Sequence, residues 1–226
     1  MNIIERAFRE LYPDKEPKYN FSLKYSAKFK PYNANVRLRG NTLIFHMSKK
    51  WKSVSKEIQI GLIQELLVKV TKNKAKTNNM DLYNIFIKKA GLAAPKTKTD
   101  EFLEESFNRV NEKYFYGMIE KPNLVWHNSS SRLGTYEYGS DTISITTALR
   151  DVDSEILDYV MYHEMLHKKY KFISKDGRNY HHTSHFKNKE REFENQKEVE
   201  KRLKHLRAPR RRNKPAGLFK KLFYFP

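Results

Sequence analysis

Residues 154–170 read SEILDYVMYHEMLHKKY and predict an amphipathic helix that begins at Ser154 or at Asp153. Apolar residues recur in this stretch at helical spacing, so we expect one side of the helix to be buried. Residues 135–146, just before it, alternate around a Gly-Ser-Asp turn and predict a β-hairpin. Hairpin and helix together indicate an α+β fold in which a small antiparallel or mixed sheet packs on this helix.

The helix carries two histidines and a glutamate at a spacing that suits metal chemistry. Residues four apart lie on one helical face, so His163 and His167 can direct imidazole nitrogens at a common point, with Glu164 beside them. Two neutral imidazoles can hold a zinc ion, and the adjacent carboxylate can take a proton from the water that the ion activates. A solvated or structurally satisfied histidine pair is the alternative interpretation. The apolar flanks favour zinc-dependent hydrolysis with Glu164 as general base and acid.

A catalytic zinc ion normally takes a third protein ligand and leaves one position for water. Three histidines follow the helix and are all plausible on pattern alone: His181, His182 and His185. If the third ligand were a carboxylate from a later helix, the candidates would be Glu190, Glu192 and Glu194. Spacing does not choose among these residues.

The composition limits both the metal ligands and the partners. The chain has no cysteine, which excludes a disulfide framework and a cysteine-ligated zinc ribbon. The formal net charge of +19 predicts a long-range attraction to polyanions, with nucleic acid as the natural candidate. A generally lysine-rich proteome is the alternative explanation of this charge.

No stretch has the apolar length of a signal-peptide core or of a membrane span. We therefore expect a soluble intracellular protein, cytoplasmic or associated with the nucleoid, that has no membrane partner. The sequence does not indicate an oligomeric state.

A composition change near residue 95 predicts two domains. Residues 91–99 place a glycine at a helix end and then a proline and small polar residues, a pattern typical of a linker. We expect an N-terminal α+β domain over residues 1–95, a second domain over residues 100–200 and a basic tail over residues 201–226.

The two predicted domains share one pattern of hairpin and helix in their sequences. Residues 35–45 form a second hairpin pattern around Gly-Asn, and the helical pattern of residues 55–70 follows it. Aligning the two hairpins puts Gln64-Glu65-Leu66-Leu67-Val68 opposite His163-Glu164-Met165-Leu166-His167. The glutamate is kept and both histidines are replaced. We interpret residues 1–95 as a degenerate, metal-free copy, against the alternative of ordinary α+β patterning.

The last part of the chain is strongly charged. Residues 187–206 mix both signs at helical spacing with few apolar positions, which predicts a solvated helix. The tail can contact phosphates through basic residues and bases through aromatic rings, or its apolar side can dock on protein. The basic residues are Arg207, Arg210, Arg211, Arg212, Lys214, Lys220 and Lys221, and the aromatic ones are Phe219, Phe223, Tyr224 and Phe225.

Residues 101–195 resemble the SprT-like metallopeptidases, which include Spartan-type proteases that act on DNA–protein crosslinks. The resemblance rests on the order and spacing of five short elements and a final His-Thr-Ser-His-Phe-Lys run. These elements are Phe107-Asn108-Arg109-Val110-Asn111-Glu112-Lys113-Tyr114-Phe115, Leu124-Val125-Trp126, Leu133-Gly134-Thr135-Tyr136, Thr142-Ile143-Ser144-Ile145 and Tyr162-His163-Glu164-Met165-Leu166-His167, with the final run at residues 182–187.

The resemblance implies a zincin-like metallopeptidase domain whose third zinc ligand is His182, the histidine four residues before Phe186. Thr183 stands where the family usually has glycine, which leaves His181 as the first alternative. His185 is then a surface residue or one that supports the ligands. The resemblance also implies that the strand at residues 142–146 edges the substrate cleft.

We therefore expect a zinc metallopeptidase with zinc on His163, His167 and His182 and with Glu164 as the catalytic residue. Its expected partners are a protein or peptide substrate and nucleic acid, and DNA–protein crosslink repair is a further hypothesis. The alternative is a nucleic-acid or ribosome-binding protein with a structural zinc site. A fourth protein ligand would favour that alternative.

Overall fold

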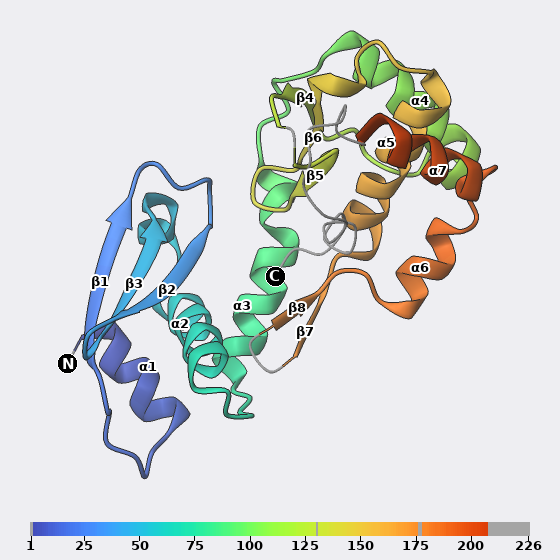
Figure 1. Ribbon diagram of the computed structural model, residues 1–226. Helices are drawn as coiled ribbons and strands as arrows, with labels where there is room; N and C mark the ends of the chain where they lie inside the picture. Colours follow the sequence, from blue (N-terminus) through green and yellow to red (C-terminus); the bar gives the residue numbers. More distant parts are fainter. Residues whose placement is uncertain (1, 130, 176–177, 208–226) are drawn as a thin grey trace. The chain divides into compact units, whose positions relative to one another are not determined.

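The computed structural model describes residues 2–129, 131–175 and 178–207, and the chain forms two compact units (Figure 1). The first unit contains the described residues up to Ala94, with 138–140 and 174–179 added from later in the chain. The second contains the described residues of 95–137, 141–173 and 180–207. The basic and aromatic residues predicted for nucleic-acid contact beyond residue 207 lie outside the described residues.

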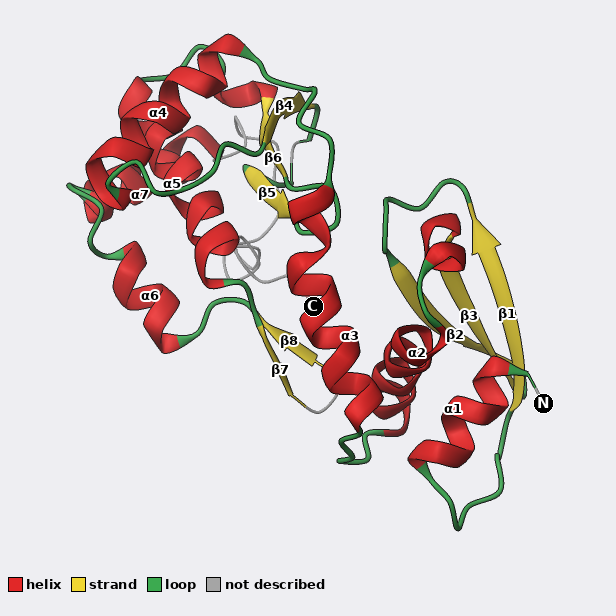
Figure 2. Ribbon diagram, turned by 180° about the vertical axis from the view of Figure 1, so that it is seen from behind, coloured by secondary structure: helices red, strands yellow, loops and turns green. Residues whose placement is uncertain are grey.

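Helices and groups of short strands follow one another along the described residues (Figure 2). Up to residue 94 the elements are α1 (Ile3–Leu11), β1 (Asn20–Ser26), β2 (Ala34–Arg39), β3 (Thr42–Ser48), η1 (Lys49–Ser53), α2 (Lys56–Thr71), α3 (Asn78–Lys89) and η2 (Ala90–Ala93). After it they are α4 (Glu101–Phe115), β4 (Asn123–His127), β5 (Gly134–Glu137), β6 (Thr142–Thr146), η3 (Thr147–Leu149), α5 (Ser154–Tyr170), β7 (Ile173–Lys175), β8 (Arg178–Tyr180), α6 (Ser184–Glu190) and α7 (Gln196–Arg207).

The first unit is a three-stranded mixed sheet packed on helices. Its strand order is β1-β3-β2, with β1 parallel and β2 antiparallel to β3. Leu43 and Phe45 of β3 are buried with Ile60 and Ile63 of α2 in one apolar cluster. The sheet therefore has one face against the helices, and α1 and α2 both contribute buried residues to this contact.

The second unit repeats this strand arrangement with its own residues. Its order is β4-β6-β5, with β4 parallel and β5 antiparallel to β6. The predicted hairpin of residues 135–146 and the predicted helix are confirmed as β5, β6 and α5, and the fold is α+β with small mixed sheets. The expectation that residues 142–146 form the edge is wrong, because β4 pairs with β6 on its other side and leaves β5 at the edge.

Local interactions fix α5, the helix that carries the histidines. Asp153 caps its start by accepting from the backbone N–H of Glu155. Asp158, one turn further on, accepts from Ser106 Oγ at 2.6 Å and from two nitrogens of Arg109 at 2.9 and 3.0 Å. These bonds join α5 to α4 and hold its rotation about its own axis.

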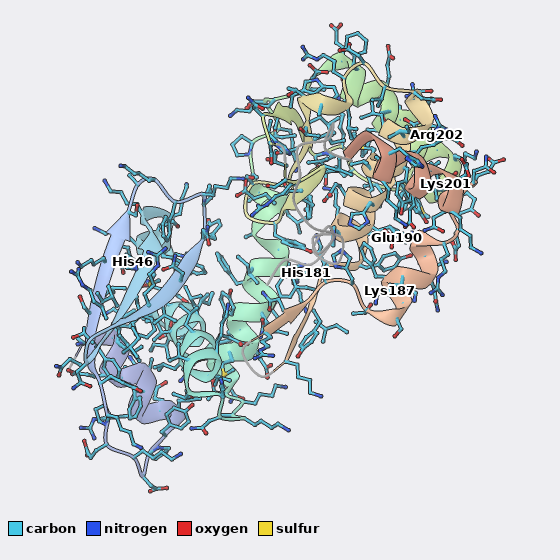
Figure 3. All side chains as sticks on the ribbon, in the orientation of Figure 1. His46, His181, Lys187, Glu190, Lys201 and Arg202 are labelled. Carbon is cyan, nitrogen blue, oxygen red and sulfur yellow. The ribbon has the colours of Figure 1, made fainter. Side chains whose placement is uncertain are left out.

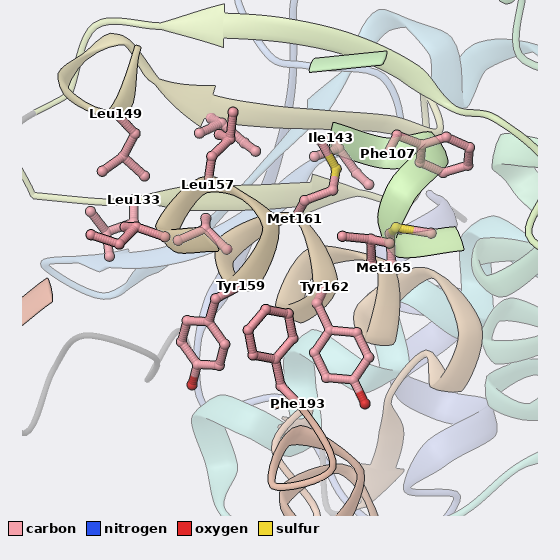
Figure 4. Packing of buried hydrophobic residues seen from close by; sticks show 14 of the residues in the cluster. Phe107, Leu133, Ile143, Leu149, Leu157, Tyr159, Met161, Tyr162, Met165 and Phe193 are labelled. Atoms are coloured by element: carbon pink, nitrogen blue, oxygen red, sulfur yellow. The ribbon is translucent and has the colours of Figure 1, made fainter. Parts of the chain in front are cut away.

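The prediction of a solvated helix over residues 187–206 is wrong. The segment forms α6 and α7, which are separated by residues 191–195, and Asn195 just before α7 has a positive φ of 57°. Four apolar side chains of this region are buried in the core of the second unit: Phe186, Phe193, Val199 and Leu203. Phe193 lies between Tyr159 and Tyr162 of α5, at ring-centroid distances of 5.2 and 5.4 Å (Figure 4). Burial of a few well-spaced apolar groups outweighs the many charges on the opposite side.

Within the described ranges, no helix has both the length and the apolar character needed to cross a membrane.

Candidate metal centre

Three histidine side chains converge in the second unit. His163 and His167 project from one face of α5, and His182 comes from the loop just before α6. Nε2 of His163 lies 3.2 Å from Nε2 of His167 and 3.3 Å from Nε2 of His182. The potential ligand atoms of the three residues all lie within 4.8 Å of one another.

These distances fit a tetrahedral ion. Two nitrogens that each lie 2.0–2.1 Å from a tetrahedral zinc ion are about 3.3–3.4 Å apart. The Nε2 atoms of His167 and His182 both lie at nearly this distance from Nε2 of His163, so a single ion could bind all three histidines. The donor set is three imidazoles without a thiolate, as in several catalytic zinc sites. The residues present therefore fit zinc.

Burial favours the neutral form of these imidazoles. Of the three rings, His163 is 2% exposed and His167 is 9% exposed. Burial lowers the pKa of His182 to about 4, with a further contribution from His163, and it also lowers the pKa of His167. Neutral imidazole is the form that binds a metal, so the site is preset for ligation at neutral pH.

Glu190, at the end of α6, orients the first histidine. Its Oε1 lies 2.6 Å from Nδ1 of His163, the ring nitrogen that faces away from the other histidines. With Nε2 as the ligand atom, Nδ1 carries the proton and donates it to this carboxylate. The hydroxyl of Tyr162 donates to the backbone oxygen of Lys189 at 2.5 Å and so anchors the end of α6 to α5. Figure 3 labels Glu190 on this helix.

Glu164 is the fourth group of the centre and is 4% exposed. It packs against Gly134 of β5, and the backbone N–H of Tyr136 on the same strand donates to its carboxylate. Burial raises the pKa of Glu164 to about 7, while nearby His163 acts in the opposite direction. The edge strand β5 thus forms the wall that holds this carboxylate beside the histidines.

A buried aspartate ties β5 and α5 together behind the site. Asp141, which is 1% exposed, accepts from the Tyr136 hydroxyl at 2.7 Å and from Lys168 Nζ at 2.6 Å on each oxygen. Lys96 Nζ donates to the same carboxylate. Since Tyr136 also bonds Glu164 through its backbone, this cluster joins the helix of the histidines to the strand that holds the glutamate.

The other sequence candidates have different surroundings. The ring of His181 contacts His167 and Phe172, with centroids 5.8 and 5.4 Å away, and the ring of His185 lies on Tyr170. Neither residue belongs to the convergent group. Among the described residues, that group consists of His163, His167 and His182.

Of the three glutamates considered as ligands, Glu190 is the one that reaches the centre, where it bonds Nδ1 of His163. Glu192 pairs with Lys189, and Glu194 pairs with Lys113. Sequence reasoning did not find the roles of Gly134 and Asp141. Gly134 begins β5 within an element that carries the family resemblance, and Asp141 lies in the predicted turn between β5 and β6, but the contacts of both residues depend on the tertiary fold.

Comparisons with known proteins give a partial match. The model of the SprT-like family matches residues 103–205. Two crystal structures of archaeal metallopeptidase zymogens are similar to the chain. Abylysin of Pyrococcus abyssi has 18% identity and a TM-score of 0.38, over 46% of this chain and 92% of that chain. Jannalysin of Methanocaldococcus jannaschii has 20% identity and a TM-score of 0.37, over 50% of this chain and 95% of that one. No curated protein matches the chain.

Proposed function

Because the model of the SprT-like family matches residues 103–205 of this chain, we propose that the protein is a zinc-dependent endopeptidase with a zincin-like catalytic domain. The observation that carries the proposal is the convergence of three histidine Nε2 atoms beside the buried carboxylate of Glu164. His163, His167 and His182 would hold the zinc ion.

A zinc ion at this site supplies Lewis-acid activation of a water molecule and of the scissile carbonyl. The chain's own residues do the rest. Glu164 accepts a proton from the attacking water and passes it to the leaving amine, as general base and then general acid. Gly134 gives the carboxylate room, and the N–H of Tyr136 fixes its orientation. Glu190 keeps His163 in the tautomer that presents Nε2.

The substrate we propose is a protein bound to nucleic acid, with DNA–protein crosslinks as the specific hypothesis. The net charge of +19 supports a polyanionic partner. The basic tail from Arg207 onward is proposed as one contact with it. A location in the cytoplasm or at the nucleoid is part of the same proposal.

The alternative is a nucleic-acid or ribosome-binding protein whose zinc is structural. A structural site closes its coordination with a fourth protein ligand. Within residues 2–129, 131–175 and 178–207, the convergent group has three members, which supports an open position for water. We therefore favour the enzyme.

We also propose that residues 1–95 are a degenerate, metal-free copy of the domain at residues 100–200. The two share the order helix, three strands, short 3₁₀ helix and long helix, with the same strand pairing. At the aligned position Gln64 bonds Ala7 O at 3.3 Å and accepts from Thr77 Oγ1 at 2.5 Å. Glu65 accepts from Asn84 Nδ2 at 2.8 Å. A chain with His163→Ala and His167→Ala is expected to bind no zinc; zinc bound by that chain would contradict a metal-free first copy.

The function is tested by cleavage of an unfolded protein such as casein, with and without single-stranded DNA. Chelation should abolish cleavage and zinc should restore it. Glu164→Gln should keep zinc yet lose at least about 100-fold in rate, since proton transfer contributes this much or more. Glu192→Gln, which changes an exposed glutamate paired with Lys189, is the control and should cleave normally. Equal cleavage by Glu164→Gln and the parent chain would refute the mechanism, and no cleavage by either would favour the structural zinc.

A further inference from the structure

The first unit contains a long stretch without acidic residues. Residues 17–56 have no Asp or Glu and ten basic residues, whereas Glu16 and Glu57 flank the stretch directly. The basic residues are Lys18, Lys24, Lys28, Lys30, Arg37, Arg39, Lys49, Lys50, Lys52 and Lys56. This stretch includes all three strands of the first sheet. A positive field is therefore concentrated on one structural element.

The sheet has one face that its helices do not cover. On β3, Leu43 and Phe45 are buried against α1 and α2, so the alternating Ile44 and His46 point to the opposite face. Figures 1 and 2 show α1 and α2 on the same side of the sheet, and Figure 3 labels His46 on the central strand. Within the described first unit, the outer face is formed by strand side chains.

Three basic side chains stand on this outer face. Strand register puts Lys24 beside His46, Arg37 beside Ile44 and Arg39 beside Thr42. All three basic residues are exposed. None of the three makes an ion pair with any residue in the described ranges, although ion pairs occur elsewhere in the unit, such as Arg6 with Glu10. Their charges are thus available to a ligand.

The second unit provides an internal comparison. Its sheet has the same strand order and pairing, and yet β4, β5 and β6 contain no Lys or Arg, and Glu137 lies on β5. A lysine-rich composition alone would place basic residues on both sheets. The charge on the first sheet is therefore a property of that surface.

We propose that the outer face of the first sheet, formed by Lys24, Arg37 and Arg39 around Ile44 and His46, binds single-stranded nucleic acid. The three basic residues contact phosphates, and bases lie on the centre of the sheet. Phe29 lies next to His46, with ring centroids 6.5 Å apart, and adds an aromatic surface at the same place. Stacking on aromatic or guanidinium groups combined with phosphate contacts is the general basis of single-strand binding.

The shape of the surface selects a single strand over a duplex. Three strands spaced 4.7–4.9 Å apart give a flat face about 10 Å across. A duplex is read by a helix or ribbon that enters a groove, and a flat sheet face offers no such projection. Splayed bases can lie on it directly. The proposed function includes a polyanionic partner, and we assign its binding to the first sheet. This assignment does not depend on whether the chain cleaves proteins.

The test measures binding of the full chain to fluorescein-labelled oligothymidine across a salt series. Lys24→Glu/Arg37→Glu/Arg39→Glu should weaken binding at least about tenfold, because three phosphate contacts are lost. The slope of log K against log salt should fall by about 2, since each single-strand contact contributes roughly 0.7. The neutral variant Lys24→Gln/Arg37→Gln/Arg39→Gln should lie between the parent and the Glu variant, which excludes misfolding as the cause.

The matched control is Lys69→Glu/Lys74→Glu/Lys89→Glu, which makes the same charge change at exposed positions of α2, α3 and their connection. This control should retain nearly the full binding affinity and the full slope of log K against log salt. Unchanged binding by the sheet variants, or an equal loss in the control, would overturn the proposal. Tighter binding of a DNA duplex or of anionic vesicles, lost in the same sheet variants, would overturn the single-strand assignment. Binding is read without cleavage, so its failure is distinct from failure of the peptidase.

Discussion

Gly134 lies directly against the carboxylate of Glu164. A Cβ atom on residue 134 would be 2.7 Å from Oε1 and 2.8 Å from Cγ of that glutamate. Any other side chain there must displace Glu164 or the edge strand β5. The glycine is therefore needed for close approach of the strand to the carboxylate.

Gly134→Ala should impair cleavage while zinc content stays unchanged. A displacement of a catalytic group by about 1 Å can cost roughly 100-fold in rate. The measurement is the cleavage rate together with zinc per chain. Thr135→Ala on the same strand, whose side chain points to the opposite face, should behave like the parent. Full activity of Gly134→Ala would contradict the prediction, because it would show that the Glu164 carboxylate can shift without loss of function.

Glu190→Gln should weaken zinc binding without removing a ligand. Loss of the charged partner of His163 Nδ1 lowers the basicity of the proposed ligand and leaves its ring less well oriented. Such changes typically weaken metal affinity by about 10–100-fold. Competition with a chromophoric chelator measures it. Glu192→Gln removes a nearby exposed carboxylate and should leave the affinity unchanged. An equal affinity in both variants would argue that His163 needs no such support.

Asp141→Asn should destabilise the second unit strongly. It leaves the Lys168 ammonium, 8% exposed, without its charged partner, and such a loss costs about 3–5 kcal/mol. Denaturant unfolding followed by a probe in the second unit checks the value. The exposed Asp151→Asn is the control and should change the free energy of unfolding little. A loss below about 1 kcal/mol would mean that water replaces the carboxylate at Lys168.

Local patterns predicted the elements that carry the site. Alternation around the Gly-Ser-Asp turn gave β5 and β6, and helical spacing gave α5 with Asp153 as one of two starts. Both signals depend on neighbours in sequence. The position of β6 at the centre of its sheet was not predictable in this way, because it depends on parallel pairing with β4 across residues 128–141.

The rest of the centre depends on contacts between residues far apart in sequence. Spacing could not predict that His182 rather than His181 converges with His163 and His167, because this depends on contacts made in the folded chain. Glu190 lies 27 residues from His163, and its carboxylate could be assigned to the ligand ring only from the fold. In α6 and α7 the few apolar residues that pack on the core stand among many charged ones, so the charge pattern predicted a solvated helix. The domain boundaries and the duplication stay predictions.

The most direct test of the central claim is zinc content after replacement of each downstream histidine. We expect one zinc ion per chain in the parent, in His181→Ala and in His185→Ala, and a marked loss of zinc in His182→Ala, since His182 is the downstream histidine that converges with His163 and His167. Full zinc occupancy in His182→Ala, or loss of zinc in His181→Ala or His185→Ala, would contradict the three-histidine centre.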